Sequence, residues 1–422
     1  MIAYAPGRVI ANDELRGHLS EGLSELDVRG KKVLAIVPDN TRTLPMPTVF
    51  ETIATAIGQR ARSLTVLIAL GTHPPLPDDE LARHLGPRWR TFPGVRVLQH
   101  RWEDPAALAQ VGTISPEEIA EISTGLLRAE VPIRISREVL DHDLVLLVGP
   151  VFPHEVVGFS GGHKYLFPGV SGPEMVHASH WLGALITNPK VNGHRDTPVR
   201  TLIERAATAV PTPRAGVSLV MRGHDLLGLF VGEVREAWEE ATRLSAEVNI
   251  VWAERSYHTV LSMAPPMYGE LWTAGKCMYK LEPVVADGGT LIIYAPHLRE
   301  ISVTHGKWLL EVGYHVRDYF LSHWDRFREV PWAVLAHSTH VKGTGTYRGG
   351  VERPRIEVVL ATGISRDVCR RLNLGYQDPA SLRPDKLADR EGVLVVPNAG
   401  ETLWRLKSDS TADTVGSTGY SA

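Results

Sequence analysis

Short segments built almost wholly of apolar residues constrain the fold of this chain more than any other feature. Three of them have the length of a β-strand and occupy residues 33–37 (VLAIV), 64–70 (LTVLIAL) and 143–149 (DLVLLVG). A further strand is expected at 95–100 (VRVLQH), and amphipathic helical segments fall near 47–60 and 78–85. Strands this apolar are typical of a parallel sheet that helices cover on both faces. The first half of the chain is therefore predicted to be an α/β domain.

The second half carries its own set of predicted strands. They are expected at 258–264 (HTVLSMA), 290–295 (TLIIYA), 333–337 (AVLAH), 356–362 (IEVVLAT) and 392–397 (GVLVVP). At about 100–200 residues per domain, a chain of 422 residues suggests two or three domains. We therefore predict two α/β domains with mainly parallel sheets, 1–250 and 251–405, and an active site in the cleft between them. Residues 406–422 are mostly small and polar and are expected to form a disordered tail.

Charge and cysteine content narrow the possible partners and compartment. Lys and Arg number 45 and Asp and Glu number 48, so the formal net charge is -3. This balance gives no electrostatic reason to expect nucleic acid or an acidic membrane surface as a partner. The N-terminus lacks a signal-peptide pattern, and the apolar runs are too short to span a membrane. Cys277 and Cys369 are too few for a disulfide framework and have no metal-binding spacing, so a cytoplasmic protein is expected. The sequence indicates no oligomeric state.

Polar clusters follow directly after three of the predicted strands. They are PDNTR (38–42), GTH (71–73) and PVFPHE (150–155). In open parallel sheets, ligands bind beyond the carboxyl ends of the strands. The three clusters are therefore predicted to meet in one pocket.

Within these clusters, one arginine and two histidines are candidates for chemistry. Arg42 has a planar group that grips a carboxylate or phosphate in two places, and Asp39 could orient it. The alternative is a turn residue beside a surface arginine. His73 is a candidate because an imidazole is suited to general acid/base work, although a histidine at a strand end is often structural. His154 ends another strand, so the two histidines could flank one substrate from opposite sides.

The run FSGGHKYLFPG (159–169) places a lysine shortly after two glycines. Gly161 and Gly162 have no side-chain bulk and allow the backbone to approach another group closely. Lys164 would then be an ion-pair partner, a phosphate ligand or a nucleophile. The alternative is a solvated lysine in a loop.

The segment PGVSGPEM (168–175) predicts the start of a helix, with Pro173 in its first turn. Backbone N–H groups at that helix start could hold an anion. His177 and His180 lie three residues apart on a similar face, from which either could ligate a metal. Lys276 falls in an apolar helical segment, YGELWTAGK (268–276), where a single lysine is usually exposed. Other histidines, around which no constellation is evident, are interpreted as bystanders: His142, His163, His194, His305 and His340.

The spacing of three of these candidates resembles that of a known family. His154, Lys164 and His180 are separated by ten and sixteen residues, with SGGHKYLFPG (160–169) between the first and the last. Together with DNTR (39–42) and GTH, this pattern is similar to that of the nickel-dependent lactate racemase family. The resemblance covers about residues 30 to 400.

The resemblance implies a cofactor and a reaction. The family uses a nickel-pincer nucleotide, a pyridinium-3-thioamide-5-thiocarboxylic acid mononucleotide that holds Ni. The reaction would invert C2 of a 2-hydroxy acid by reversible hydride transfer to the cofactor, through a 2-keto acid. Cofactor-synthesis enzymes would then be partners of the protein.

Carried over residue by residue, the resemblance also implies roles. Lys164 would be joined covalently to the cofactor, His180 would ligate nickel, and His73 and His154 would be the acid/base pair. The remaining implied contacts are of two kinds: Asp39, Thr41, Gly161 and Gly162 with the cofactor, and Arg42, Lys276, Trp272 and Thr273 with the substrate.

One departure from the family pattern bears on the substrate. Trp272 and Thr273 stand where the lactate enzymes have Tyr and Gln, while Lys276 is retained. A 2-hydroxy acid racemase or epimerase is therefore expected, and the sequence does not identify which 2-hydroxy acid it acts on. Two other hypotheses stay open. One is a zinc hydrolase that uses the histidines as ligands, and the other is a non-catalytic carboxylate-binding protein.

Overall fold

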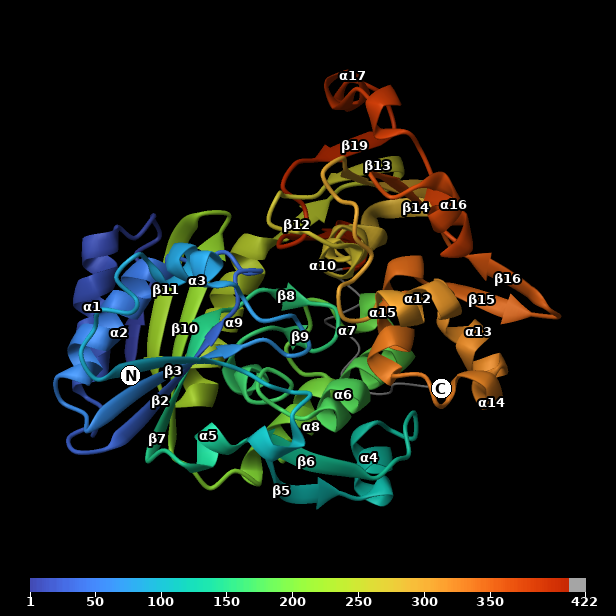
Figure 1. Ribbon diagram of the computed structural model, residues 1–422. Coiled ribbons are helices and arrows are strands. Elements are labelled where there is room, and N and C mark those ends of the chain that lie inside the picture. Colours follow the sequence, from blue (N-terminus) through green and yellow to red (C-terminus); the bar gives the residue numbers. More distant parts are fainter. Residues whose placement is uncertain (410–422) are drawn as a thin grey trace.

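The structure is a computed structural model that describes residues 1–409 (Figure 1). The first half forms a seven-stranded sheet with the order β1-β11-β10-β7-β2-β3-β4. Its parallel strands are β2 (Lys32–Pro38), β3 (Ser63–Ala69), β4 (Val95–Gln99), β7 (Leu144–Pro150) and β10 (Arg214–Arg222). At one edge, β11 (Asp225–Gly232) and β1 (Ile2–Tyr4) pair antiparallel.

Helices cover both faces of this sheet, as the apolar strands predict. One face carries α1 (Asn12–Ser24), α2 (Met46–Gly58) and α3 (Asp78–Leu85), and the other carries α6 (Pro173–Ile186), α8 (Pro198–Thr208) and α9 (Val234–Asn249). Successive side chains of a strand point to opposite faces. Accordingly, Val33 and Val37 of β2 pack with α1 and α2, whereas Leu34 packs with α6 and α8.

The second half forms a five-stranded sheet in which every pairing is parallel. Its order is β18-β17-β14-β13-β19, with β13 (Tyr257–Met263), β14 (Val285–Ala295), β17 (Glu357–Thr362), β18 (Gly375–Tyr376) and β19 (Val393–Val396). The predicted fold class, α/β with mainly parallel sheets, is confirmed. The domain boundary between residues 250 and 251 stays a prediction.

The chain end returns to the start of the second half. β20 (Leu403–Leu406) pairs in parallel with β12 (Ile250–Ala253). The tail was predicted to begin at residue 406. Leu406 is the last residue of β20, and residues 407–409 follow it. Residues 410–422 lie outside the described part of the chain. No helix within residues 1–409 is long and apolar enough to cross a membrane.

The strand expected at 333–337 is wrong, because this segment lies within the helix α15 (Trp332–Lys342). Residues 333–341 of this helix are all buried, so its apolar residues show no helical periodicity. A short apolar run without periodicity does not distinguish a buried helix from a buried strand. The helix ends at Gly343, which has a φ of 83°.

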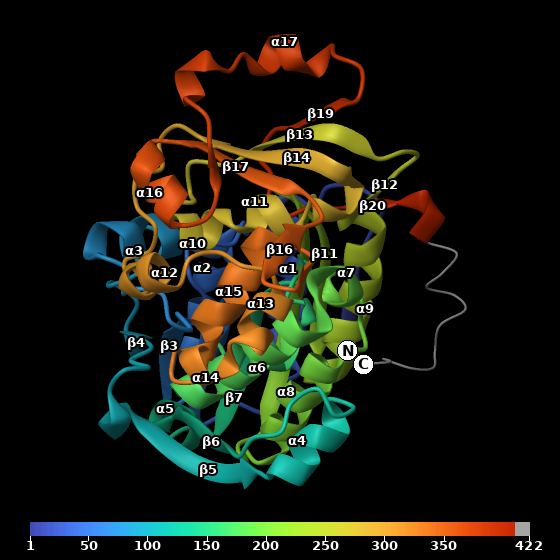
Figure 2. The same ribbon diagram turned by 90° about the vertical axis from the view of Figure 1, so that its right-hand side faces the viewer.

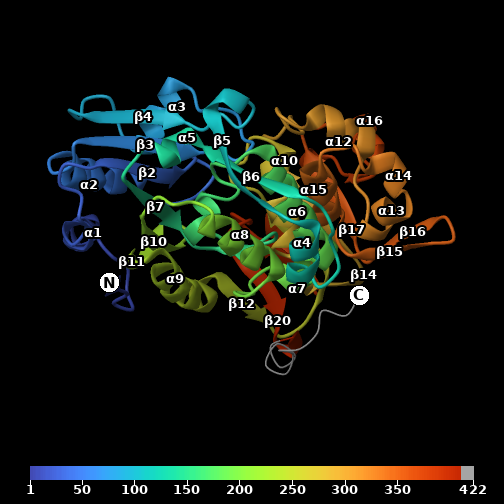
Figure 3. The ribbon, with the colours of Figure 1, turned by 90° about the horizontal axis from the view of Figure 1, so that it is seen from below.

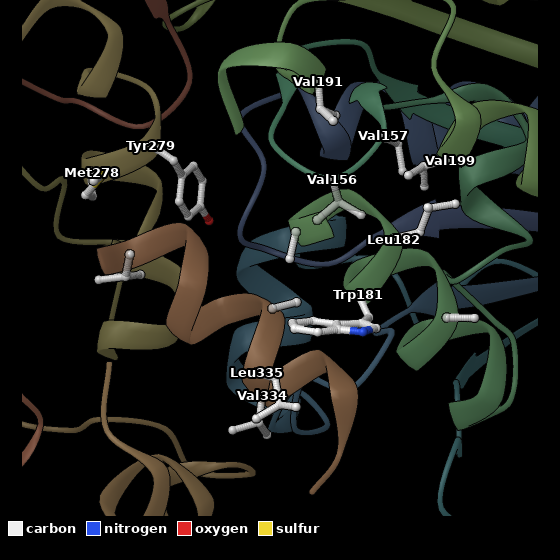
Figure 4. Close-up of a cluster of buried hydrophobic side chains, with 14 of the residues drawn as sticks. Val156, Val157, Trp181, Leu182, Val191, Val199, Met278, Tyr279, Val334 and Leu335 are labelled. Carbon is white, nitrogen blue, oxygen red and sulfur yellow. The ribbon is translucent and has the colours of Figure 1, made fainter. Parts of the chain in front are cut away.

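Helix α15 joins the two halves through a shared core. It follows α12 (Gly306–Val312), α13 (Arg317–Ser322) and α14 (Trp324–Phe327), and it packs against α6 of the first half (Figures 1 and 2). Figure 4 shows Trp181 of α6 beside Leu335 of α15. The Trp181 ring also stacks on Trp324, with centroids 5.6 Å apart and an interplanar angle of 11°. One continuous hydrophobic core therefore spans both halves.

A small antiparallel pair extends the first half away from the second sheet. It consists of β5 (Leu108–Ile114) and β6 (Val131–Ser136), with α4 (Pro116–Ile122) beside it (Figure 3). The N–H of Gly172, at the start of α6, donates to Arg134 O on β6 at 2.9 Å. This pair supports the start of α6 from the side opposite to α15.

Candidate active site

The three polar clusters predicted to meet do line one cavity. β7, β2 and β3 are neighbours in the sheet, and their carboxyl ends lead to His154, Arg42 and His73 respectively. The cavity has a volume of about 140 Å³ and is closed on its other side by residues of the second half. Ten of the twelve residues proposed from the sequence line it: Asp39, Thr41, Arg42, His73, His154, Lys164, His180, Trp272, Thr273 and Lys276.

Gly161 and Gly162 are the two proposed residues that do not line the cavity. Both adopt positive φ, at 84° and 58°. A Cβ on Gly161 would lie 2.7 Å from Val151, and one on Gly162 would lie 3.0 Å from the ring of Trp238. The expected approach to a cofactor is therefore not the reason for these glycines in this structure. They make room for Trp238, which fixes the turn that carries Lys164.

His73 is held by a carboxylate. Its Nδ1 lies 2.5 Å from Oδ2 of Asp39, whose other oxygen accepts hydrogen bonds from the N–H and hydroxyl of Thr41 at 3.1 and 2.7 Å. Burial alone would raise the pKa of Asp39, but His73, Thr41 and Arg42 bring it below its usual value. Because an ionised carboxylate only accepts hydrogen bonds, Nδ1 of His73 carries a proton. In the neutral ring, Nε2 therefore presents a lone pair.

His154 is held in the opposite way. The backbone N–H of Val156 donates to its Nδ1 at 3.1 Å, so this nitrogen is the acceptor and Nε2 carries the proton of the neutral ring. Burial, together with the charges of Lys164 and Arg42, holds the pKa of His154 well below its usual value. The cavity is thus lined by one histidine that can accept a proton at Nε2 and another that can donate a hydrogen bond from Nε2.

Lys164 lies within the 3-10 turn Gly162–Tyr165 and is half-buried in the cavity wall. Burial and then the charge of Arg42 lower its pKa to about 7. Within residues 1–409 its amine has no hydrogen-bond or ion-pair partner. A substantial fraction of this amine is therefore neutral and nucleophilic near pH 7.

His180, rather than His177, is the α6 histidine that lines the cavity. Its Nδ1 donates to Val176 O at 2.7 Å, which leaves the lone pair on Nε2. Burial and then the charge of Lys164 lower its pKa to about 3, so the ring is neutral. A ring nitrogen fixed by a backbone carbonyl, with the other nitrogen free, is the usual arrangement of a metal-ligating histidine.

Arg42 and Lys276 are two basic residues that were predicted to contact the substrate, and both line the cavity. Burial alone would lower the pKa of Arg42, but Asp39 and Glu155 raise it, so the guanidinium is charged. Lys276 is 6% exposed, and its Nζ lies 3.3 Å from Thr41 O. The expectation that a lone lysine in such a helix is exposed to solvent is therefore wrong for Lys276. Burial and then Arg42 lower the pKa of Lys276 to about 7.

Five further lining residues were not predicted from the sequence, two in the first half and three in the second. They are Glu155, Tyr165, Tyr279, His337 and His340. His337 was not recognised because its segment was read as a strand. His340 was interpreted as a bystander, which is wrong because it lines the cavity. The available signal was their spacing of three residues on a helix. His305, interpreted as a bystander, stacks on Trp272 with centroids 4.4 Å apart and lies behind the cavity wall.

A second, outer cavity adjoins the first. It has a volume of about 730 Å³ and shares Asp39, Thr41, His73 and Thr273 with the inner one. Its rim includes Pro74, Pro75, Pro266 and Met267. The inner cavity therefore opens outward past His73.

Fold and site together define a class of protein: an α/β protein with two mainly parallel sheets and a cavity lined by paired histidines and cations. Comparison with known sequences narrows this class. The family model for the lactate racemase N-terminal domain matches residues 14–192. The chain is 23% identical over 278 residues to a lactate racemase of Thermoanaerobacterium thermosaccharolyticum and 25% identical over 289 residues to one of Lactiplantibacillus plantarum. Each match covers 65% of this chain and 62% of the relative, so it spans less than two thirds of either lactate racemase.

Two solved structures share the fold. A Thermotoga maritima protein superposes with a TM-score of 0.89 at 31% identity, covering 96% of this chain and 100% of that one. The lactate racemase apoprotein of T. thermosaccharolyticum superposes with a TM-score of 0.71 at 17% identity, covering 94% of each chain. Residues 14–192 thus match the lactate racemase N-terminal domain family, and the chain as a whole shares its fold with a lactate racemase apoprotein.

Proposed function

We propose that this protein is a racemase or epimerase that inverts C2 of a 2-hydroxy acid. The observation that carries the proposal is the pair of histidines held in complementary tautomers. Asp39 leaves His73 with a free acceptor at Nε2, and the N–H of Val156 leaves His154 with a donor at Nε2. Inversion at C2 requires removal of one proton and return of another, so it needs this combination.

The residues present fit the nickel-pincer nucleotide of the family. Lys164 offers an unpaired amine for covalent attachment, and His180 offers Nε2 to nickel. Within residues 1–409, no group of three His, Cys, Asp or Glu side chains could hold a metal by itself. A metal that brings its own sulfur ligands needs only one ligand from the protein, and soft sulfur ligands suit nickel. When bound, the cofactor would supply a reversible hydride acceptor.

The protein's own residues would bind the acid and move its protons. Arg42 and Lys276 would hold the carboxylate, which limits the motion of the reacting carbon. His73 Nε2 would take the proton of the C2 hydroxyl as C2 becomes the planar carbon of a 2-keto acid. His154 would return a proton from Nε2 to that oxygen when the opposite face is reduced. For this step its ring would be the imidazolium, with the Nδ1 proton facing the Glu155 carboxylate 3.5 Å away, so that a neutral ring remains afterwards. The reverse direction exchanges the two roles.

Intact-protein mass spectrometry, metal analysis and a chiral assay test this proposal. Protein produced together with the cofactor-synthesis enzymes should carry a nucleotide-sized adduct and one nickel, and it should interconvert the two configurations of a 2-hydroxy acid. Lys164→Arg should lack the adduct, while His180→Ala should keep the adduct and lose nickel. An active wild-type protein with an unmodified Lys164 and no nickel would overturn the proposal.

The two other hypotheses give different results in the same experiment. A zinc hydrolase needs about three protein ligands for its metal, which the described residues do not offer. One equivalent of zinc without a lysine adduct would nevertheless favour it. A non-catalytic carboxylate-binding protein would bind acids equally well after both His73 and His154 are replaced, and would show no turnover.

A further inference from the structure

One helix in the cavity wall carries three buried polar atoms without a partner. They are Nδ1 of His337, Oγ1 of Thr339 and Nε2 of His340, all on α15, and none has a hydrogen-bond partner among residues 1–409. The three side chains are at least 93% buried. Buried polar atoms are nearly always paired, and an unpaired one destabilises a protein by about 1–3 kcal/mol. Three such atoms on one helix beside a cavity point to a ligand.

The side chains that carry these atoms line two cavities, which share His340. His337 and His340 line the inner cavity, and His340 and Thr339 also line a neighbouring one of about 50 Å³. The second cavity has further polar residues, including Asn188 and Thr344. A ligand that fills both cavities is therefore longer than the reacting end of a 2-hydroxy acid.

The chemistry of His337 selects for a hydrogen-bond donor. Its Nε2 lies 3.0 Å from Trp272 O, which can only accept, so Nε2 carries the proton and Nδ1 presents a lone pair. Burial lowers the pKa of His337 to about 3, so the ring stays neutral and Nδ1 stays an acceptor. Trp272 stacks on the same ring, with centroids 4.2 Å apart and an interplanar angle of 12°, and fixes its orientation.

The nearby charge disfavours a second carboxylate. Glu155 lines the inner cavity, and although burial would raise its pKa, Lys280 and His340 lower it, so it is an anion. Lys280 does not line the cavity, because its ammonium donates to Pro153 O. Arg42 and Lys276 are assigned to the carboxylate next to C2. Arg317 and Glu282 also line the second cavity, but Arg317 is paired with Asp318, and Glu282 accepts hydrogen bonds from Asn188 and Thr344. The polar atoms left without a partner suit hydroxyls, which are neutral and both donate and accept.

We propose that His337, Thr339 and His340 recognise hydroxyl groups farther along the substrate, so that the substrate is a polyhydroxylated 2-hydroxy acid. This inference rests on the proposed function for the position of C2. It also explains the change from the family's Tyr-Gln to Trp272 and Thr273, since Trp272 is the residue that holds His337 in place.

Binding and turnover on a matched set of acids test the inference. The set is 2-hydroxypropanoate, 2,3-dihydroxypropanoate, 2,3,4-trihydroxybutanoate and the dicarboxylate 2-hydroxybutanedioate. Affinity is measured by calorimetry on the full chain with its cofactor, and inversion at C2 by chiral chromatography. We expect the trihydroxy acid to exceed the unsubstituted acid in affinity and in kcat/KM by at least about tenfold. The dicarboxylate should bind worst.

Substitutions separate recognition from packing. His337→Phe keeps an aromatic ring against Trp272 and should reduce the preference for hydroxylated acids at least about tenfold. His337→Asn, whose amide can return an acceptor, should restore part of it. His305→Phe is the matched control, because His305 also stacks on Trp272 but does not line the cavity, and it should leave the preference unchanged.

The results distinguish this inference from the proposed function. If 2-hydroxypropanoate or the dicarboxylate bound and turned over as well as the trihydroxy acid or better, the inference would be overturned. The proposed racemase activity would not be affected by that result. Preferential binding of hydroxylated acids without inversion at C2 would support the recognition role and overturn the racemase. A loss of the preference in His305→Phe as large as that in His337→Phe would assign the effect to packing and overturn the inference.

Discussion

Nδ1 of His73 lies 2.5 Å from Oδ2 of Asp39, a carboxylate that also accepts two hydrogen bonds from Thr41. The pair joins the ends of two adjacent strands, β2 and β3, at the mouth of the inner cavity. The sequence analysis assigned Asp39 to the cofactor or to Arg42. In the structure it is placed to fix the tautomer of His73, and this placement leads to the first prediction.

Asp39→Asn should lower kcat by about 10²–10⁴-fold. The amide can donate to Nδ1 of His73, which moves the ring proton to Nε2 and removes the acceptor from the cavity. Initial rates of the nickel-loaded enzyme from either configuration of the substrate measure the effect. Asp79→Asn, on the exposed side of α3, is the control and should leave kcat unchanged. A normal kcat in Asp39→Asn would exclude the tautomer role.

His154→Gln should also lower kcat by about 10²–10⁴-fold, starting from either configuration. A glutamine keeps a polar group in the cavity but cannot take up and release a proton. The same chiral assay measures this effect, with the exposed His258→Gln as the control. Near-normal rates would remove His154 from the mechanism, even if the His73 prediction holds.

Lys280 should make the stability of the protein depend on pH. Burial lowers its pKa from 10.5 to about 7 in the folded state. Between about pH 7 and pH 10 the unfolded chain therefore binds a proton that the folded protein does not, and the free energy of unfolding rises with pH. One such group contributes at most about 1.4 kcal/mol per pH unit.

Lys280→Met should reduce this rise, because methionine does not titrate. Urea unfolding of the cofactor-free protein at several pH values between 7 and 10 measures the slope. Lys386→Met, an exposed lysine on α17 (Pro384–Ala388), is the control and should leave the slope as it is in the wild type. An unchanged slope in Lys280→Met would show that the buried amine does not titrate in this range.

Trp181→Ala should lower the free energy of unfolding by about 3–5 kcal/mol. Trp181 is 1% exposed and packs in the core shared by α6 and α15. Because that core spans both halves, urea unfolding should shift as one transition, monitored by fluorescence and by circular dichroism. Trp308→Ala, which alters a more exposed indole on α12, should change stability by less than about 1 kcal/mol. Two separate transitions would contradict the shared core.

The sequence predicted the parts of the site that local pattern determines. DNTR, GTH and PVFPHE each follow an apolar strand, and parallel strands place their carboxyl ends at one edge of a sheet. The positions of Arg42, His73 and His154 in one cavity follow from that rule. The start of α6 at Pro173 was likewise predicted from its turn and N-terminal residues.

The parts of the site that the sequence did not predict depend on contacts between segments that are distant along the chain. Nothing near His337 or His340 in the sequence indicates that α15 packs on α6, and the fully buried helix has no polar face to reveal its period. The role of Gly161 and Gly162 depends on Trp238, more than seventy residues away along the chain. The hydrogen bond of Asp39 to His73 was not predicted, because His73 is near in space but distant in sequence, whereas Arg42 is near in sequence.

The joint packing of α6 and α15 determines how solutes exchange with the buried chamber. Separating the helices would wet Trp181 and Leu335, at a cost of about 1.5–3 kcal/mol for each side chain. Solutes are therefore expected to enter and leave through the mouth beside Pro74 and Met267, because passage there exposes no core side chains. The residence time of a product would then depend on passage through that mouth, and not on separation of the two halves of the protein.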